Sequence, residues 1–264
     1  MSLINDYLLS LSREQGKALY GLTGNIAMAV MALAVIVYLL RMRVKPIENV
    51  KALVIGYLVF MFNGYAQRFI VWYRVGFDPD RYFQTANIAL AYTLLPLLVW
   101  LCAKTFNTSF GFAGDVAALT SLGYHVVGRS GCTFTGCCYG FSCEWGVYSR
   151  VTQANQFPVC WVESLFTLAI LVYLFLRIFR KGYVPDGKML PLFLLLYGVC
   201  RFFSEMTRES TKDLWLFWRI SDVHLHMLVM AALGGFLLWR ITKRERTAAV
   251  GEETPLPTLN GQRK

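Results

Sequence analysis

Charged residues are few in this sequence. Asp, Glu, Lys and Arg make up 16% of its 264 residues and hydrophobic residues 56%, whereas soluble domains usually carry about 25% charged residues. This composition excludes an ordinary soluble domain. Several runs are also long enough for a membrane-spanning helix, which needs roughly 20 mostly apolar residues. The sequence therefore predicts an all-α, polytopic integral membrane protein.

Several signatures are missing as well. The sequence has no zinc-finger, helix-turn-helix or P-loop pattern, so its net charge of +10 does not indicate nucleic-acid binding. Lys and Arg instead concentrate in short polar connectors, as membrane orientation requires. The absence of an internal repeat counts against a transporter. The first residues lack the basic start and apolar core of a cleavable signal peptide, so none is expected.

Seven apolar segments predict about seven transmembrane helices. They cover residues 21–40, 52–73, 83–103, 116–127, 159–179, 190–203 and 223–239. The fourth is short and polar, so we expect it to be broken or buried among its neighbours. Residues 1–240 would form a single membrane-embedded domain, and residues 241–264 a polar, disordered tail in the cytoplasm.

The basic residues predict the orientation. The connectors 41–51 and 177–188 and the start of the tail are rich in Lys and Arg, whereas the connectors of the other parity mix them with Asp and Glu. Basic connectors belong in the cytoplasm. With seven spans, the N-terminus is expected outside and the C-terminus inside. The polar stretch HVVGRSGCTFTGCCYGFSCEWG (125–146) would then lie at the outer face.

Ionisable residues within apolar segments are costly in a membrane, so they are functional candidates. His125 and Arg129 lie one helical turn apart, directly before a glycine-rich loop, and Glu163 lies near the start of the fifth span. His224 and His226 at the start of the seventh span point to nearly opposite sides of a helix. They would make a poor pair of metal ligands, and two interfacial histidines explain them equally well.

A stripe of polar residues begins within the sixth span and continues past its end. Its members are spaced by four, four and three, and so share one helical face: Tyr197, Arg201, Glu205 and Arg208. Such a face is expected to point into the bundle, where its two arginines and Arg129 could hold a phosphate. The alternative is an Arg201–Glu205 pair that only anchors the helix end at the interface.

Four of the seven cysteines lie in the polar stretch with the spacing C-x4-CC-x4-C: Cys132, Cys137, Cys138 and Cys143. Zinc sites usually use closer pairs separated by a longer spacer, so no metal is expected, although His125 could add a ligand. A Cys132–Cys143 or a Cys137–Cys143 disulfide is possible in an outer loop, and the spacing does not choose between them. A nucleophilic cysteine is a further alternative, since Arg129 and His125 would lower a thiol pKa. Cys102 and Cys200 are expected to be small hydrophobic residues.

Several motifs resemble those of the prolipoprotein diacylglyceryl transferases. GRSGCTFTGCCYG is similar to that family's loop G-R-x-G-N-F-x-N-G-E, and GDVAALTSLGYHVVGR to the helix before it. FPVCWVES resembles H-P-S-Q-L-Y-E, with Glu163 at the glutamate. LYGVCRFFSEMTRES is similar to Y-G-x-x-R-F-x-x-E-x-x-R, and His226 in DVHLHML lies near the glutamine of a Gly-Gln motif. The first hundred residues resemble the family only in hydropathy.

The resemblance implies a bacterial inner-membrane transferase with its active site toward the outer face. Such an enzyme moves the diacylglyceryl group of phosphatidylglycerol to the thiol of a lipobox cysteine on a precursor protein. For this sequence, another lipid acceptor is the alternative. Glycerol phosphate is released and no cofactor is implied. Arg129 and Arg201 would clamp the phosphate and the transition state, and His125 would be the base.

The remaining expectations concern the loop and its alternatives. Cys132, Thr135 and Cys137 stand where the family has asparagines and a glutamate, and the family's H-G-G motif is absent. We expect catalytic roles for Arg129, Arg201, His125, Cys137 and Cys138. The expected substrate-binding residues are Gly128, Gly131, Cys132, Tyr139, Glu163, Tyr197, Glu205, Arg208 and His226. The alternatives are a cysteine-nucleophile lipid transferase and a non-catalytic lipid-binding or transport protein whose loop is held by a disulfide or zinc.

Overall fold

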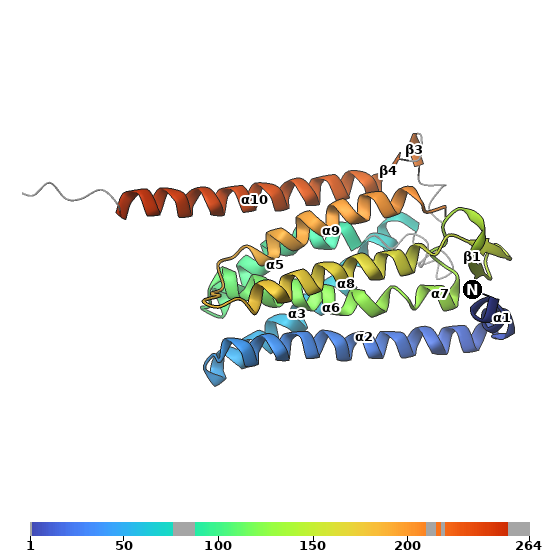
Figure 1. Ribbon diagram of the computed structural model, residues 1–264, viewed down its shortest axis with the longest axis horizontal. Helices are drawn as coiled ribbons and strands as arrows, with labels where there is room; N and C mark the ends of the chain where they lie inside the picture. The colour runs from blue at the N-terminus through green and yellow to red at the C-terminus, as the bar shows by residue number, and fades with distance from the viewer. Residues whose placement is uncertain (1, 76–87, 210–214, 218–219, 253–264) are drawn as a thin grey trace, which may run out of the picture.

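The computed structural model describes residues 2–75, 88–209, 215–217 and 220–252 and is mostly helical (Figure 1). Within these residues, seven long helices form a bundle: α2 (Arg13–Met42), α3 (Pro46–Val75), α5 (Ile88–Thr105), α6 (Phe110–Gly128), α8 (Val159–Ile178), α9 (Met189–Met206) and α10 (Asp222–Glu252). The short elements are α1 (Ser2–Ser10), α7 (Cys132–Thr135), β1 (Ser142–Ser149), β2 (Ala154–Gln156), β3 (Trp215–Phe217) and β4 (Ile220–Ser221).

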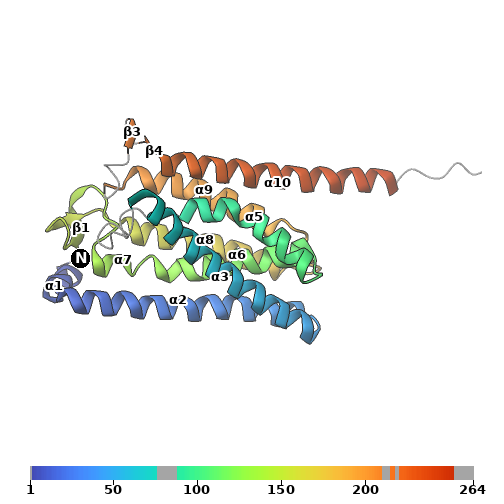
Figure 2. The same cartoon turned by 180° about the vertical axis from the view of Figure 1, so that it is seen from behind.

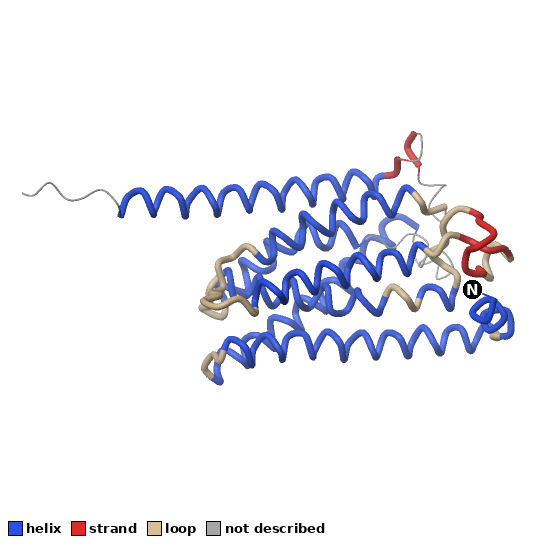
Figure 3. Tube along the Cα trace, viewed as in Figure 1, coloured by secondary structure: helices blue, strands red, loops and turns tan. Residues whose placement is uncertain are grey.

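Two small sheets correct the expectation of an all-α fold. β1 pairs with β2, and β3 with β4, each pair antiparallel. All the strands gather at one end of the bundle (Figure 3). Backbone polar groups in a connector need hydrogen-bond partners, and strand pairing supplies them there.

Five of the described helices are long and apolar enough to cross a membrane. Their spans are Arg13–Met42, Pro46–Ala66, Val159–Ile178, Met189–Met206 and Val223–Thr247. The apolar part of α5 is shorter, from Ala91 to Thr105. α6 carries glycines together with Asp115 and His125, which lower its hydropathy. That α5 and α6 also cross the membrane, which would bring the number of spans to seven, therefore stays a prediction.

α6 is the centre of the bundle. It contacts α2, α3, α5, α8 and α9, and most of its residues from Gly111 to Gly123 are fully buried. Small residues let its neighbours approach closely: a Cβ on Gly123 would lie 2.8 Å from the Cα of Met31 on α2. The fourth predicted span is thus buried, as expected, but it is one continuous helix and is not broken.

α10 extends beyond the rest of the bundle at its C-terminal end (Figure 1). It continues to Glu252, so the first half of the expected disordered tail is helical. Arg, Lys, Glu and Ala are good helix formers, which explains the extension. An ion pair of 2.5 Å between Lys188 and Glu245 fastens this stretch to the start of α9. Residues 253–264 of the expected tail lie outside the described residues.

The polar elements gather at what we call the loop end. α6 and α9 finish there, α8 and α10 begin there, and α1, α7 and the strands lie beside them (Figures 1 and 2). Asn5 on α1 accepts a hydrogen bond from the Tyr148 backbone N–H at 2.9 Å and donates one to the Gly146 carbonyl at 3.1 Å. The stretch 125–146 therefore lies at one end of the bundle. The side of the membrane that this end faces stays a prediction.

Candidate active site

Three arginines meet at one carboxylate, that of Glu163 near the start of α8. Its Oε2 pairs with Arg129, and its Oε1 pairs with Arg201 and with Arg208, the latter at 3.1 Å. The Ser204 hydroxyl donates to the same Oε1 at 3.2 Å. Glu163 is only 3% exposed, and buried charges need such pairing. The fold thus brings the ends of α6 and α9 to the start of α8.

A second carboxylate, Glu205, completes this arginine cluster. Its Oε2 lies 2.7 Å from Nη2 of Arg201 and 3.5 Å from Nε of Arg208. The inward-facing stripe is confirmed, because Tyr197, Arg201, Glu205 and Arg208 are all buried. The Arg201–Glu205 pair does form, but it is buried and shared with Glu163, so it is not a simple interfacial anchor. Nε of Arg201 is buried and has no hydrogen-bond partner among the residues that the structure describes.

His125 lies deeper on α6, between two tyrosines. Its Nε2 is 2.8 Å from the Tyr197 hydroxyl and its Nδ1 is 3.4 Å from the Tyr92 hydroxyl. A neutral imidazole has one donor and one acceptor nitrogen, so it can donate to one tyrosine and accept from the other. The expected base is therefore linked to the arginine cluster through the α9 face that carries Tyr197.

The loop that carries Arg129 is held by close packing. Arg129 caps the end of α6, and Gly131 precedes α7 in a right-handed helical conformation. A Cβ on Gly131 would collide with the Thr23 hydroxyl of α2. Gly128 and Gly131 are expected to bind substrate, and that role stays a prediction. Packing requires Gly131, and the left-handed glycine is Gly136, with φ of 71°, which ends α7.

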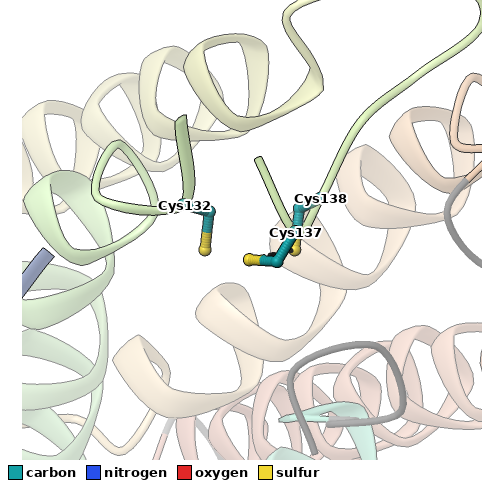
Figure 4. Close-up of side chains that lie close together, drawn as sticks. All are labelled: Cys132, Cys137 and Cys138. Atoms are coloured by element: carbon teal, nitrogen blue, oxygen red, sulfur yellow. Dashed lines mark hydrogen bonds between the residues drawn. The ribbon is translucent and has the colours of Figure 1, made fainter. Parts of the chain in front are cut away.

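Three cysteine sulfurs converge after Arg129. The Sγ atoms of Cys132, Cys137 and Cys138 all lie within 4.8 Å of one another (Figure 4). The Arg129 Nη1 lies 3.7 Å from Sγ of Cys138. All seven cysteines fall within the described residues and all are free thiols. Neither of the two disulfides considered for Cys143 is formed, and that residue lies on β1 outside the group.

Sequence reasoning missed Cys160. Its thiol donates to the Cys138 carbonyl at 3.2 Å, and the residue lines a small cavity together with Cys132 and Cys138. The zinc spacing argument relied on Cys143, whereas the fold brings Cys160 to the loop instead. A signal was present, because Cys160 lies one helical turn before Glu163, which was already a candidate.

Comparison with known families decides the affiliation. The family model for prolipoprotein diacylglyceryl transferase matches residues 18–240, which is most of the chain. The chain belongs to the prolipoprotein diacylglyceryl transferase family.

Individual relatives bear names of this family. A phosphatidylglycerol–prolipoprotein diacylglyceryl transferase of Aeromonas hydrophila is 29% identical over 160 residues, which cover 57% of this chain and 56% of the relative. One from Dehalococcoides mccartyi is 27% identical over 161 residues, or 56% of this chain and 59% of the relative. A transferase 2 of Clostridium perfringens is 26% identical over 135 residues, or 48% and 50%. The chain spans a little over half the length of the relatives that it matches best here.

In this member of the family, the cysteine cluster differs in acidity from one thiol to the next. Hydrogen bonds from the thiols of Cys132, Cys137 and Cys160, together with the charge of Arg208, lower the pKa of the Cys138 thiol well below its usual range. Hydrogen bonds with Cys132 and Cys138 raise the pKa of Cys137. Cys138 is therefore the more acidic of the two neighbouring thiols for which a catalytic role is expected.

The family's signature loop is joined to α9 by its backbone. The Phe141 N–H donates to the Thr207 carbonyl at 3.1 Å, and the Glu209 N–H donates to the Tyr139 carbonyl at 3.2 Å. Gly140 pairs with Arg208 in an isolated bridge. A Cβ on Gly140 would lie 2.8 Å from the Thr207 carbonyl oxygen. The loop and Arg208 are therefore held in a fixed relation.

Two other residues expected to bind substrate are Gly128 on α6 and His226 on α10. Gly128 packs against the Tyr124 ring, 3.1 Å from where its Cβ would lie. His226 is half-buried on α10, and its binding role stays a prediction. The fully buried histidine is His224, whose ring packs on Phe202. The two histidines thus differ in burial, as expected for opposite sides of a helix.

Proposed function

We propose that this family member is a membrane-embedded transferase that moves the diacylglyceryl group of phosphatidylglycerol to a thiol. The names of its relatives support the donor and the precursor-protein acceptor. We place the reaction at the outer face of a bacterial inner membrane, with seven spans and the C-terminus in the cytoplasm. The basic connectors support this orientation.

The observation that carries the proposal is the arginine cluster at the loop end. Arg129, Arg201 and Arg208 share two carboxylates, and the buried Nε of Arg201 has no partner within the described residues. A buried donor without an acceptor costs about 1–3 kcal/mol. A phosphate oxygen of the donor lipid would satisfy it. Guanidinium groups suit this task because they remain charged and bind phosphate through two N–H groups.

The chemistry follows from the charge that develops. The acceptor thiolate attacks the glycerol carbon, a C–S bond forms, and the C–O bond to the phosphate breaks. The electron pair moves to the phosphate oxygen, and glycerol phosphate leaves. Arg129 and Arg201 stabilise that developing charge where water is scarce. Glu163, Glu205 and Ser204 hold the guanidinium groups in place.

The proton of the acceptor thiol needs a destination. His125 is the proposed base. Its Nε2 lies 2.8 Å from the Tyr197 hydroxyl, and we propose that this hydroxyl connects the imidazole to the reacting groups. A proton leaving the thiol would pass to the imidazole through the tyrosine hydroxyl. The Tyr197 hydroxyl lies on the same α9 face as Arg201, so the base and the phosphate clamp share one helix.

The test is a transfer assay with purified protein in detergent. It uses labelled phosphatidylglycerol with either a lipobox peptide or total membrane lipids as acceptor. Arg201→Gln should lose at least 100-fold in rate, the effect of removing one stabilising donor. Arg180→Gln, an exposed arginine at the other end, should match the unaltered protein. No product above the Arg201→Gln background would refute the transferase. Product with lipids but none with the peptide would refute the protein acceptor alone.

A further inference from the structure

The proposed transfer leaves the cysteine cluster without a role. Cys132, Cys137, Cys138 and Cys160 come from α7, the loop after it and the start of α8. Three of the sulfurs, those of Cys132, Cys137 and Cys138, lie within 4.8 Å of one another. Cys160 lines a small cavity together with Cys132 and Cys138, and its thiol donates to the Cys138 carbonyl at 3.2 Å. Figure 4 shows the Cys132 and Cys137 sulfurs pointing toward each other, with that of Cys138 beside them.

The separation of two adjacent sulfurs matches that of ligands on a single thiophilic ion. Zinc binds cysteine sulfur at about 2.3 Å, and a tetrahedron with such bonds has sulfur–sulfur edges of about 3.8 Å. Sγ of Cys137 lies 3.7 Å from Sγ of Cys138. A small cavity of about 30 Å³ is lined by Cys132, Cys138 and Cys160 among others. It has room for a water molecule or an ion and is far too small for a lipid.

We propose that Cys132, Cys137, Cys138 and Cys160 bind one divalent ion of the zinc class as a closed tetrathiolate site. On binding, the four thiols release their protons to solvent and become thiolates. Soft sulfur ligands select zinc over magnesium or calcium. A disulfide would join only two of these sulfurs and leave the other two facing it.

The surroundings suit the charge of such a site. Four thiolates around Zn²⁺ carry two net negative charges. Arg129 points its Nη1 at Sγ of Cys138, 3.7 Å away, and the charge of Arg208 also acts on that sulfur. N–H donors to metal-bound ligands are typical of the groups that orient a metal site.

The ion would link two of the elements that carry the arginine cluster, the end of α6 and the start of α8. Cys132 lies three residues after Arg129, and Cys160 lies three residues before Glu163. Coordination would therefore fix the end of α6 relative to the start of α8, where the Arg129–Glu163 pair forms. The role is structural, because four protein ligands leave no open position.

Metal analysis of the full-length protein, purified in detergent without chelators, tests the site. We expect one zinc per chain by mass spectrometry of the elements. Replacement by Co²⁺ should give sulfur-to-cobalt charge-transfer absorption and the visible bands of a tetrahedral ion. Cys132→Ser and Cys160→Ser should lose most of the zinc. Cys143→Ser, at the same end of the molecule but outside the cluster, and Cys200→Ser should keep it.

A measurement on the unaltered protein guards against variants that fail to fold. Titration with an organomercurial should release the zinc as the four cluster thiols react. The proposal is overturned if reduced protein binds no stoichiometric zinc when Zn²⁺ is added. A disulfide within the cluster, or full zinc content in Cys160→Ser, overturns it equally. None of these readouts involves lipid transfer, so the metal site and the proposed activity can fail separately.

Discussion

Glu163→Gln would test whether one carboxylate holds the three arginines. Glutamine keeps the shape of the side chain but removes its charge and turns an N–H₂ group toward a guanidinium. Arg129, Arg201 and Arg208 all pair with the native carboxylate, which is almost fully buried. Breaking a buried ion pair costs about 3–5 kcal/mol. We expect Glu163→Gln to lower the free energy of unfolding by about 3 kcal/mol, the low end of that range, because the glutamine oxygen can still accept one hydrogen bond.

The matched control is Glu245→Gln. Glu245 also pairs with a cation, Lys188, at 2.5 Å, but its side chain is 47% exposed. Exposed pairs contribute about 0–1 kcal/mol, so this change should leave the free energy of unfolding almost unaltered. The measurement is unfolding in mixed micelles with increasing SDS, followed by circular dichroism. A loss for Glu163→Gln within 1 kcal/mol of the control would refute the reasoning.

A double-mutant cycle would show whether the loss arises from pairing. Arg208→Gln removes one of the partners, at 3.1 Å from Oε1 of Glu163. If the two charges interact, the double variant should lose less free energy of unfolding than the sum of the single variants, by about 0.5–3 kcal/mol. Strict additivity would mean that Glu163 stabilises the fold through contacts other than this pair.

Three further outcomes are expected. Tyr197→Phe should slow transfer without loss of lipid binding, measured as a fall in kcat at unchanged KM, because the imidazole loses its 2.8 Å partner. Tyr38→Phe should lower the free energy of unfolding by about 1 kcal/mol, since Asp115 loses the 2.9 Å hydrogen bond from its hydroxyl. In intact cells, an impermeant maleimide should label Cys143 but not Lys181→Cys, as peptide mapping would show; the reverse pattern would invert the proposed orientation.

The polar stripe on α9 could be predicted because it depends on helical period alone. Intervals of four and four place Tyr197, Arg201 and Glu205 on one face of a helix, and the cost of burying charge in a membrane directs that face inward. Arg208 was expected to continue the face, but α9 ends at Met206, and Arg208 is positioned by its bridge with Gly140 instead. The same cost made Glu163 a candidate, and the family's motifs matched it to a glutamate. That three arginines would meet on it could not be predicted, because they come from two helix ends that only the packed bundle brings together.

Other features of the structure were not predicted from the sequence, for identifiable reasons. Cys160 belongs to an apolar helix start, so the loop's own spacing pointed to Cys143, and the chain turns back to α8 between the two. The helical extension of α10 past residue 241 was missed because high polarity was taken for disorder, although Arg, Lys, Glu and Ala favour helix. The strand pairs arise from backbone needs in the connectors, which side-chain patterns do not record.

The signature loop is joined to α9 by main-chain hydrogen bonds at residues 139–141. Such bonds do not depend on which side chains stand nearby, so exchanging asparagine and glutamate for cysteine does not undo them. The frame can therefore stay constant through evolution while the groups it displays are replaced. Gly140 is the exception, since its Cβ would collide with the carbonyl of Thr207, the residue directly after α9. Family members that keep this glycine but carry other side chains in the loop would share the backbone structure and differ in the chemistry of the site.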